Sequence, residues 1–224
     1  PWTTELSKLA ESHDELWIDL SSLAAYPPLA RFQTILGLLA EGTTREQILD
    51  AAMRATRHDG LCSVSFRQLA AEVGVKSASV HYHFPTKPDL AESMVRRYVV
   101  DFEARLADIS QRRRTLIGKI EALISVFGDV LARDELCLCG MMAAELTALD
   151  SGTRLALRQF FNATEDWLRD EIETHRHEVR IDLASGDLAR VLLAGLEGAV
   201  LLDRVDQQGR RLEAFRRLAR ATLG

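Results

Sequence analysis

At 224 residues, with 47% hydrophobic and 27% charged residues, the chain is long enough to bury a full core and too apolar to be intrinsically disordered. No apolar run reaches the roughly 18 residues of a membrane span, and no basic segment followed by a cleavable apolar one opens the chain, so we expect a cytoplasmic protein. The three cysteines, Cys62, Cys137 and Cys139, are too few for a disulfide scaffold and fit a reducing compartment.

The net charge of −5 is unevenly distributed along the chain. Residues 1–42 carry two basic and six acidic groups, residues 43–100 carry eight and six, and residues 101–224 carry eighteen and twenty-one. Only the middle segment is positive. Because attraction to phosphate is screened within about 10 Å, that segment is where contact with a nucleic acid is expected.

Residues 1–42 show leucines and aromatic residues at roughly helical spacing, interrupted by the helix-breaking pair Pro27-Pro28. This segment is either a packed extension or a poorly ordered leader with no role in binding. Both interpretations remain open.

Residues 43–84 predict three helices with well-marked ends. The first begins at a capping threonine and ends at Gly60, the second runs from Ser65 to Gly74, and the third is short, from Ser77 to Phe84. Two helices joined by a tight turn that contains glycine, the second of them short and polar on one side, are typical of a helix-turn-helix.

The short third helix has two distinct faces. Val80 and Phe84, four residues apart, are expected to face the core. Ser77, Ala78 and His81 lie on the opposite face, where small side chains would let the backbone approach base edges. An ordinary helical hairpin with a solvated face has the same spacing, so the pattern alone leaves both interpretations open.

The continuous stretch from Thr44 to Leu90 resembles the TetR family of bacterial transcriptional regulators. It contains REQILDAA, then Gly60, then SFRQLAAEVGVKSASVHYHFPTKPDL, in which the run Gly-Val-x-x-x-x-Val-x-Tyr-His-Phe-x-x-Lys is highly specific. The resemblance implies an all-α protein with an N-terminal three-helix helix-turn-helix DNA-binding domain at 43–90 and a C-terminal helical ligand-binding and dimerisation domain at 91–224. Residues 1–42 would be an extension of unclear role.

Carried over residue by residue, the resemblance assigns contacts with bases or phosphates, or the positioning of the reading helix, to ten residues. These are Ser65, Arg67, Lys76, Ser77, Ala78, Ser79, His81, Tyr82, His83 and Lys87. His81 departs from the family pattern, since many members have tyrosine there. His83 has a second interpretation, as a structural residue that donates a hydrogen bond inward.

Downstream of residue 86 the apolar periodicity predicts helices over 86–109, 112–133, 141–149, 151–179, from 185 onward, and 212–223. The segment LARVLLAGLEGAVLL is too apolar for a lone surface helix, and its small residues permit close approach. It resembles the family's penultimate helix, which forms a four-helix bundle with its two-fold mate. The expected homodimer interface contains Leu192, Gly195, Gly198, Ala199 and Leu202.

The resemblance also implies a pocket for a small-molecule inducer among the helices between Ala91 and about Val179. Apolar and aromatic side chains there suit a mostly apolar ligand, oriented by a few polar groups. The candidate lining residues are Met94, Tyr98, Phe102, Phe127, Met141, Met142, Glu145, Arg158, Phe161 and Trp167.

Two other patterns suggest functional sites at first, but a structural interpretation is favoured for each. The Cys137-Leu-Cys139-Gly run admits a metal site, a thiol sensor or buried small hydrophobes, and its spacing is tighter than zinc sites use, so buried hydrophobes are favoured and no metal or cofactor is expected. The basic run 112–114 fits a solvated loop.

Signals of catalysis are absent from the sequence. It contains no phosphate-binding loop, no nucleophile elbow and no diagnostic pairing of histidine with carboxylate, so an enzyme is not expected. We expect a repressor that an inducer releases from double-stranded operator DNA. An activator or nucleoid-like binder is the nearer alternative, and a helical enzyme or carrier domain is the more distant one.

Overall fold

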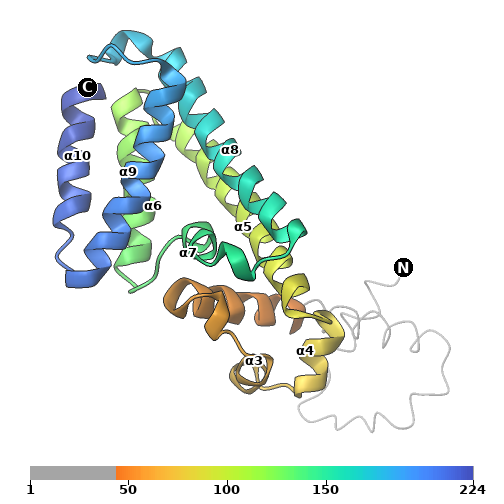
Figure 1. Cartoon of the computed structure of the whole chain (residues 1–224). Coiled ribbons are helices and arrows are strands. Elements are labelled where there is room, and N and C mark those ends of the chain that lie inside the picture. The colour runs from red at the N-terminus through yellow and green to blue at the C-terminus, as the bar shows by residue number, and fades with distance from the viewer. Residues whose placement is uncertain (1–43, 224) are drawn as a thin grey trace, which may run out of the picture. The chain divides into compact units, whose positions relative to one another are not determined.

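The computed structural model describes residues 44–223, and every regular element within them is a helix, which confirms the predicted all-α class (Figure 1). Both interpretations of residues 1–42 lie outside the described residues. None of the helices between residues 44 and 223 is long and apolar enough to cross a bilayer.

The helix-turn-helix forms where the sequence predicts it. A helix over residues 44–59 is followed by a 3-10 turn at Leu61–Ser63, and the motif itself consists of α3 (Phe66–Val73) and α4 (Ser77–His83). These short elements bury apolar side chains of one contiguous core. The local signals at the ends of the helices were therefore sufficient to place them.

Two glycines end these helices with backbone angles that other residues rarely adopt. The φ angle is 86° at Gly60 and 77° at Gly74. A Cβ atom on Gly60 would also lie 2.3 Å from Glu145 Oε1. At Gly74 glycine is required only by the positive φ angle of the turn. At Gly60 it is required both by the φ angle and by the close approach of the Glu145 side chain.

A single long helix, α5 (Lys87–Arg112), begins directly after the helix-turn-helix and packs against the C-terminal helices further along its length. Its start is a capping box, in which Asp89 N–H donates to Thr86 Oγ1 at 3.3 Å and Thr86 N–H donates to the Asp89 carboxylate at 2.9 Å. With 26 residues, the helix is about 39 Å long. Thr86 and Asp89 therefore fix the direction of a rigid connection between the two predicted domains.

Five further α-helices complete the described chain. The predicted boundaries at 112–133, 141–149 and 151–179 differ from the observed ones by up to five residues. The helices are α6 (Leu116–Leu131), α7 (Leu138–Ala144), α8 (Ser151–Thr174), α9 (Ser185–Asp206) and α10 (Arg210–Leu223), with 3-10 turns at Leu146–Ala148 and Arg176–Glu178.

The core of these C-terminal helices contains a cluster of aromatic rings. Phe102 of α5 lies with its ring centroid 5.1 Å from that of Phe160 and 6.3 Å from that of Phe127. Tyr98, one turn earlier, stacks on Phe102 at 5.9 Å. Since α5, α6 and α8 each contribute a ring, the cluster holds the long helix against its neighbours.

Candidate DNA interface and effector site

The short helix α4 presents the two faces that its sequence predicts. Val80 and Phe84 are buried, with exposed fractions of 0% and 1%. Ser77, Ala78 and His81 are exposed on the other side. The small residues stand at the N-terminal end of α4, so an approaching duplex would meet little steric resistance there.

The aromatic side chains of α4 differ in their freedom. The His81 ring packs against Phe66 of α3, with centroids 4.8 Å apart, and its Nδ1 lies 3.4 Å from the Pro85 carbonyl oxygen. Tyr82 is 69% exposed and meets the half-buried His83 ring edge-on. Within residues 44–223 the His83 ring makes no hydrogen bond, so its interpretation as an inward donor has no support from the structure.

The basic residues proposed to contact DNA fall into two groups. Arg67 and Lys76 are exposed and have no ion-pair partner among the described residues. Lys87 is different, because its ammonium donates to the Cys62 carbonyl at 3.1 Å. Arg67 and Lys76 are therefore available to phosphates, whereas Lys87 holds the 3-10 turn against the start of α5. Of the other proposed residues, Ser65 and Ser79 are half-buried.

The residues expected to line the inducer pocket do not form one cavity wall. Met94, Phe102, Phe127 and Met142 are buried core residues. Tyr98 donates its hydroxyl to Cys137 Sγ at 3.7 Å.

The remaining candidates for that pocket are spread over the fold. Trp167 donates to Ser110 Oγ at 2.9 Å, and Phe161 and Met141 are partly buried side chains that pack against the core. The Glu145 carboxylate accepts from the Cys62 N–H at 2.9 Å, and Arg158 is exposed on α8.

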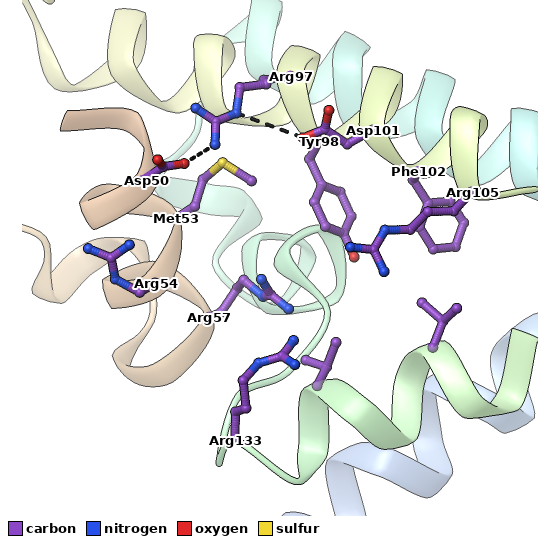
Figure 2. A pocket seen from close by; sticks show the side chains of 12 residues that line it. Asp50, Met53, Arg54, Arg57, Arg97, Tyr98, Asp101, Phe102, Arg105 and Arg133 are labelled. Carbon is purple, nitrogen blue, oxygen red and sulfur yellow. Dashed lines mark hydrogen bonds and ion pairs between the residues drawn. The ribbon is translucent and has the colours of Figure 1, made fainter. Parts of the chain in front are cut away.

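The structure instead shows a polar cavity of about 280 Å³ where the helix 44–59, α5 and α6 meet (Figure 2). Tyr98 and Phe102 are the residues of the expected set that line it. Five arginines also line it, and the sequence analysis did not identify them. The sequence does contain a pattern that indicates two of these arginines, since Arg97, Asp101 and Arg105 recur at intervals of four and therefore share one face of a helix. The complete lining consists of Asp50, Met53, Arg54, Arg57, Arg97, Tyr98, Asp101, Phe102, Arg105, Val126, Val130 and Arg133.

The residues expected at the dimer interface divide between two faces of α9. Leu192 and Ala199 are buried within the protomer, and Gly195 lies under the Phe215 ring, where a Cβ atom would be 2.8 Å from Cε2. Gly198 faces open space among the described residues, and Leu202 is 52% exposed. Other exposed apolar side chains on these last two helices are Val191, Leu201 and Val205 of α9 and Leu218 of α10.

The two cysteines of the Cys-x-Cys run are buried. Burial raises the pKa of the Cys137 and Cys139 thiols well above the usual range, which disfavours the reactive thiolate. Residues 44–223 contain no group of three or more metal-ligating side chains. Arg113 and Arg114 lie in the exposed connection between α5 and α6, and Arg112 ends α5.

Comparisons with known proteins agree with this geometry. Residues 48–94 match the family model described as "Bacterial regulatory proteins, tetR family". The chain is 25% identical over 160 residues to the nucleoid occlusion factor SlmA of Marinomonas sp., covering 70% of this chain and 80% of the relative. It is 24% identical to the HTH-type transcriptional regulator LmrA of Bacillus subtilis, covering 73% and 88%.

Solved structures extend the likeness to the C-terminal helices. A TetR transcriptional regulator from Legionella pneumophila superposes with a TM-score of 0.72 at 28% identity, covering 80% of this chain and 96% of that one. The similarity therefore includes both the helix-turn-helix and the helices that follow it.

Proposed function

We propose, from the premise that this chain belongs to the TetR family of DNA-binding transcriptional regulators, that it is a homodimeric repressor which a small-molecule inducer releases from its operator. The observation that supports the proposal is the continuity of α5. Its first turns bury Leu90 and Met94 beside the helix-turn-helix, and its later turns bury Phe102 and Leu106 among the C-terminal helices. A displacement of α5 would therefore move α4 with it.

Binding energy can act through such a connection only if the ligand prefers one position of α5. Two recognition helices must stand roughly 34–36 Å apart to enter successive major grooves. An inducer can bind more tightly to a dimer whose recognition helices have a different spacing. It then lowers operator affinity, at most by the ratio of its affinity for that dimer to its affinity for the DNA-binding dimer. The exposed apolar side chains of α9 and α10 support this proposal, because a two-fold dimer would bury them against the same side chains of its partner.

We assign base reading to the exposed face of α4 and phosphate contacts to its flanks. Ser77, Ala78 and His81 lie on that face, and Arg67 and Lys76 provide cations that no described carboxylate neutralises. The test is selection of the preferred operator from random duplexes, followed by titration of that operator and a scrambled duplex. We expect at least a thousandfold preference for the selected sequence. Equal affinity for both duplexes would refute specific regulation.

A second candidate is suggested by the similarity to SlmA, whose name describes a nucleoid occlusion factor. A protein of that type would occupy sites along the chromosome rather than one promoter. Mapping the bound sites in cells distinguishes the two. Sites concentrated at one or a few promoters support the repressor, and dispersed sites support nucleoid occlusion.

A further inference from the structure

We propose that the cavity between the helix 44–59, α5 and α6 is an effector site for a small organic carboxylate with an aromatic or aliphatic body. This assignment rests on the proposed ligand-responsive repression and names the class of ligand. A volume of about 280 Å³ is just below the usual range for ligand cavities, about 300–1,000 Å³, so the ligand is small.

The positive and negative charges around the cavity are unevenly distributed. Its two carboxylates, Asp50 and Asp101, are both ion-paired to the same residue, Arg97 (Figure 2). Arg54 pairs with Glu72 outside the cavity at 2.9 Å. Arg97 also pairs with Glu46 at 2.7 Å, so three carboxylates share one guanidinium and the negative charge is concentrated at this edge of the cavity.

Three guanidinium groups remain on the other side. Arg57 and Arg133 share one carboxylate, that of Glu135, at 3.1 and 3.6 Å. Arg105 has no carboxylate within 4.0 Å among the described residues. The Arg57 side chain is only 16% exposed, so its charge is poorly screened by water. Figure 2 shows the side chains of Arg57, Arg105 and Arg133 directed into the same space.

This excess of positive charge is the feature that a ligand carboxylate would complement. Guanidinium groups match the planar geometry of a carboxylate and can bind it through paired hydrogen bonds. Glu135 provides one negative charge for two arginines, Arg57 and Arg133. An anion bound between Arg105 and Arg133 would provide a second negative charge.

The apolar side of the cavity determines which kind of body can be attached to the ligand's carboxylate. Tyr98 and Phe102 line it from α5, and Val126 and Val130 line it from α6. Because the Tyr98 hydroxyl is already directed to Cys137, the tyrosine contributes mainly apolar surface to the cavity. A carboxylate head with a ring or a short alkyl chain therefore fits the lining better than a polyanion or a sugar acid does.

Binding there would act on the DNA-binding domain directly. Arg57 lies in the last turn of the helix 44–59, and its backbone carbonyl accepts from the Leu136 N–H at 3.0 Å. A ligand that drew Arg57 toward Arg105 would compete with Glu135 and shift that helix relative to α6. The same contact that holds the ligand would thus favour a different position of the helix-turn-helix.

The test uses the full chain and isothermal titration with benzoate, phenylacetate and hexanoate against their neutral amides. We expect the carboxylates to bind at least tenfold more tightly than the amides. Arg105→Gln should weaken carboxylate binding roughly tenfold to a hundredfold, the effect of losing a charged hydrogen bond. Arg113→Gln is the matched control, because Arg113 is exposed, lies just beyond α5 and is outside the cavity.

The outcomes separate this assignment from the proposed function. Absence of carboxylate binding, equal binding of amides, or an Arg105→Gln variant that binds like the Arg113→Gln control overturns the assignment. Binding that depends on Arg105 but leaves the operator occupied supports the site and refutes induction through it. Release of the operator by a neutral compound that competes with no carboxylate supports induction and overturns this site.

Discussion

Replacing Glu197 by glutamine tests the electrostatics of the fold at one buried carboxyl group. Glu197 points from α9 toward α7, where a Cβ atom on Gly140 would lie 2.6 Å from Glu197 Oε2. Its Oε1 has no hydrogen-bond partner among the described residues. Burial is the main cause that raises the pKa of Glu197 from 4.5 to about 7.

The size of the effect follows from that shift. The folded state holds the Glu197 proton more tightly than the unfolded state, so its contribution to stability is complete below pH 4.5 and is lost as the pH rises through about 7. A shift of this size corresponds to about 3 kcal/mol of unfolding free energy. Glutamine carries no charge at any pH, so Glu197→Gln removes this loss.

Urea unfolding at pH 5 and pH 8, at a fixed protein concentration, measures it. We expect Glu197→Gln to be more stable than the wild type at pH 8, by up to about 3 kcal/mol, and the advantage to shrink at pH 5. Glu103→Gln is the control, because Glu103 is exposed on α5. If the advantage of Glu197→Gln is the same at both pH values, Glu197 does not titrate as a buried group and the reasoning is wrong.

Four further predictions concern assembly, DNA binding and stability. Gly198→Arg should convert the proposed dimer to a monomer in light scattering, since it puts a long charged side chain on the exposed face of α9; an unchanged mass would place the interface elsewhere. Lys76→Ala should weaken binding to all duplexes and lower the salt dependence by about one charge, and an unchanged slope would remove Lys76 from the phosphate contacts. His81→Ala should alter base preference by about 1–3 kcal/mol, whereas equal losses on selected and scrambled DNA would show that it reads no base. Lys87→Ala should lower the stability by about 1 kcal/mol in thermal unfolding, because its ammonium holds the Cys62 carbonyl; a loss confined to DNA affinity would contradict that role.

The elements that the sequence predicts well are those whose ends are marked locally. Gly60, Gly74 and the Thr86 capping box each end or begin a helix through interactions within a few residues of chain. The neighbouring residues therefore suffice to predict these helix ends from the sequence. The start of α7 carries no such mark. Its N-cap residue, Cys137, makes no side-chain capping hydrogen bond, and the helix begins at Leu138, three residues before the predicted start.

The end of α8 shows the same limit. The apolar periodicity continues to Val179, but the helix stops at Thr174 and a 3-10 turn follows. The His175 ring lies 3.1 Å from the Arg114 carbonyl oxygen, across more than fifty residues of chain. A contact of this kind depends on the packing of α8 against the α5–α6 connection, and periodicity within one segment does not contain that information.

The candidate effector site was difficult to predict for a related reason. Apolar residues such as Met94 and Met142 occur at core spacing, and the structure places them in the core. The cationic cavity joins Arg57, Arg105 and Arg133, which come from three elements far apart in the sequence. Helical spacing indicates which face of α5 carries Arg105, but it does not reveal which other helices that face meets.

The last turn of the helix 44–59 is where the proposed activities meet. Arg57 lines the cationic cavity, and the next residue, His58, accepts a hydrogen bond through its carbonyl oxygen from Arg204 of α9 at 2.5 Å. Arg204 also pairs with Asp134 at 3.3 Å, close to Arg133 in the chain. The helix that carries the proposed dimer surface therefore contacts the DNA-binding domain beside the proposed effector site. A shift of this one turn would change the ligand contacts and the link to the dimer helix together, which is the coupling that ligand-controlled release of DNA requires.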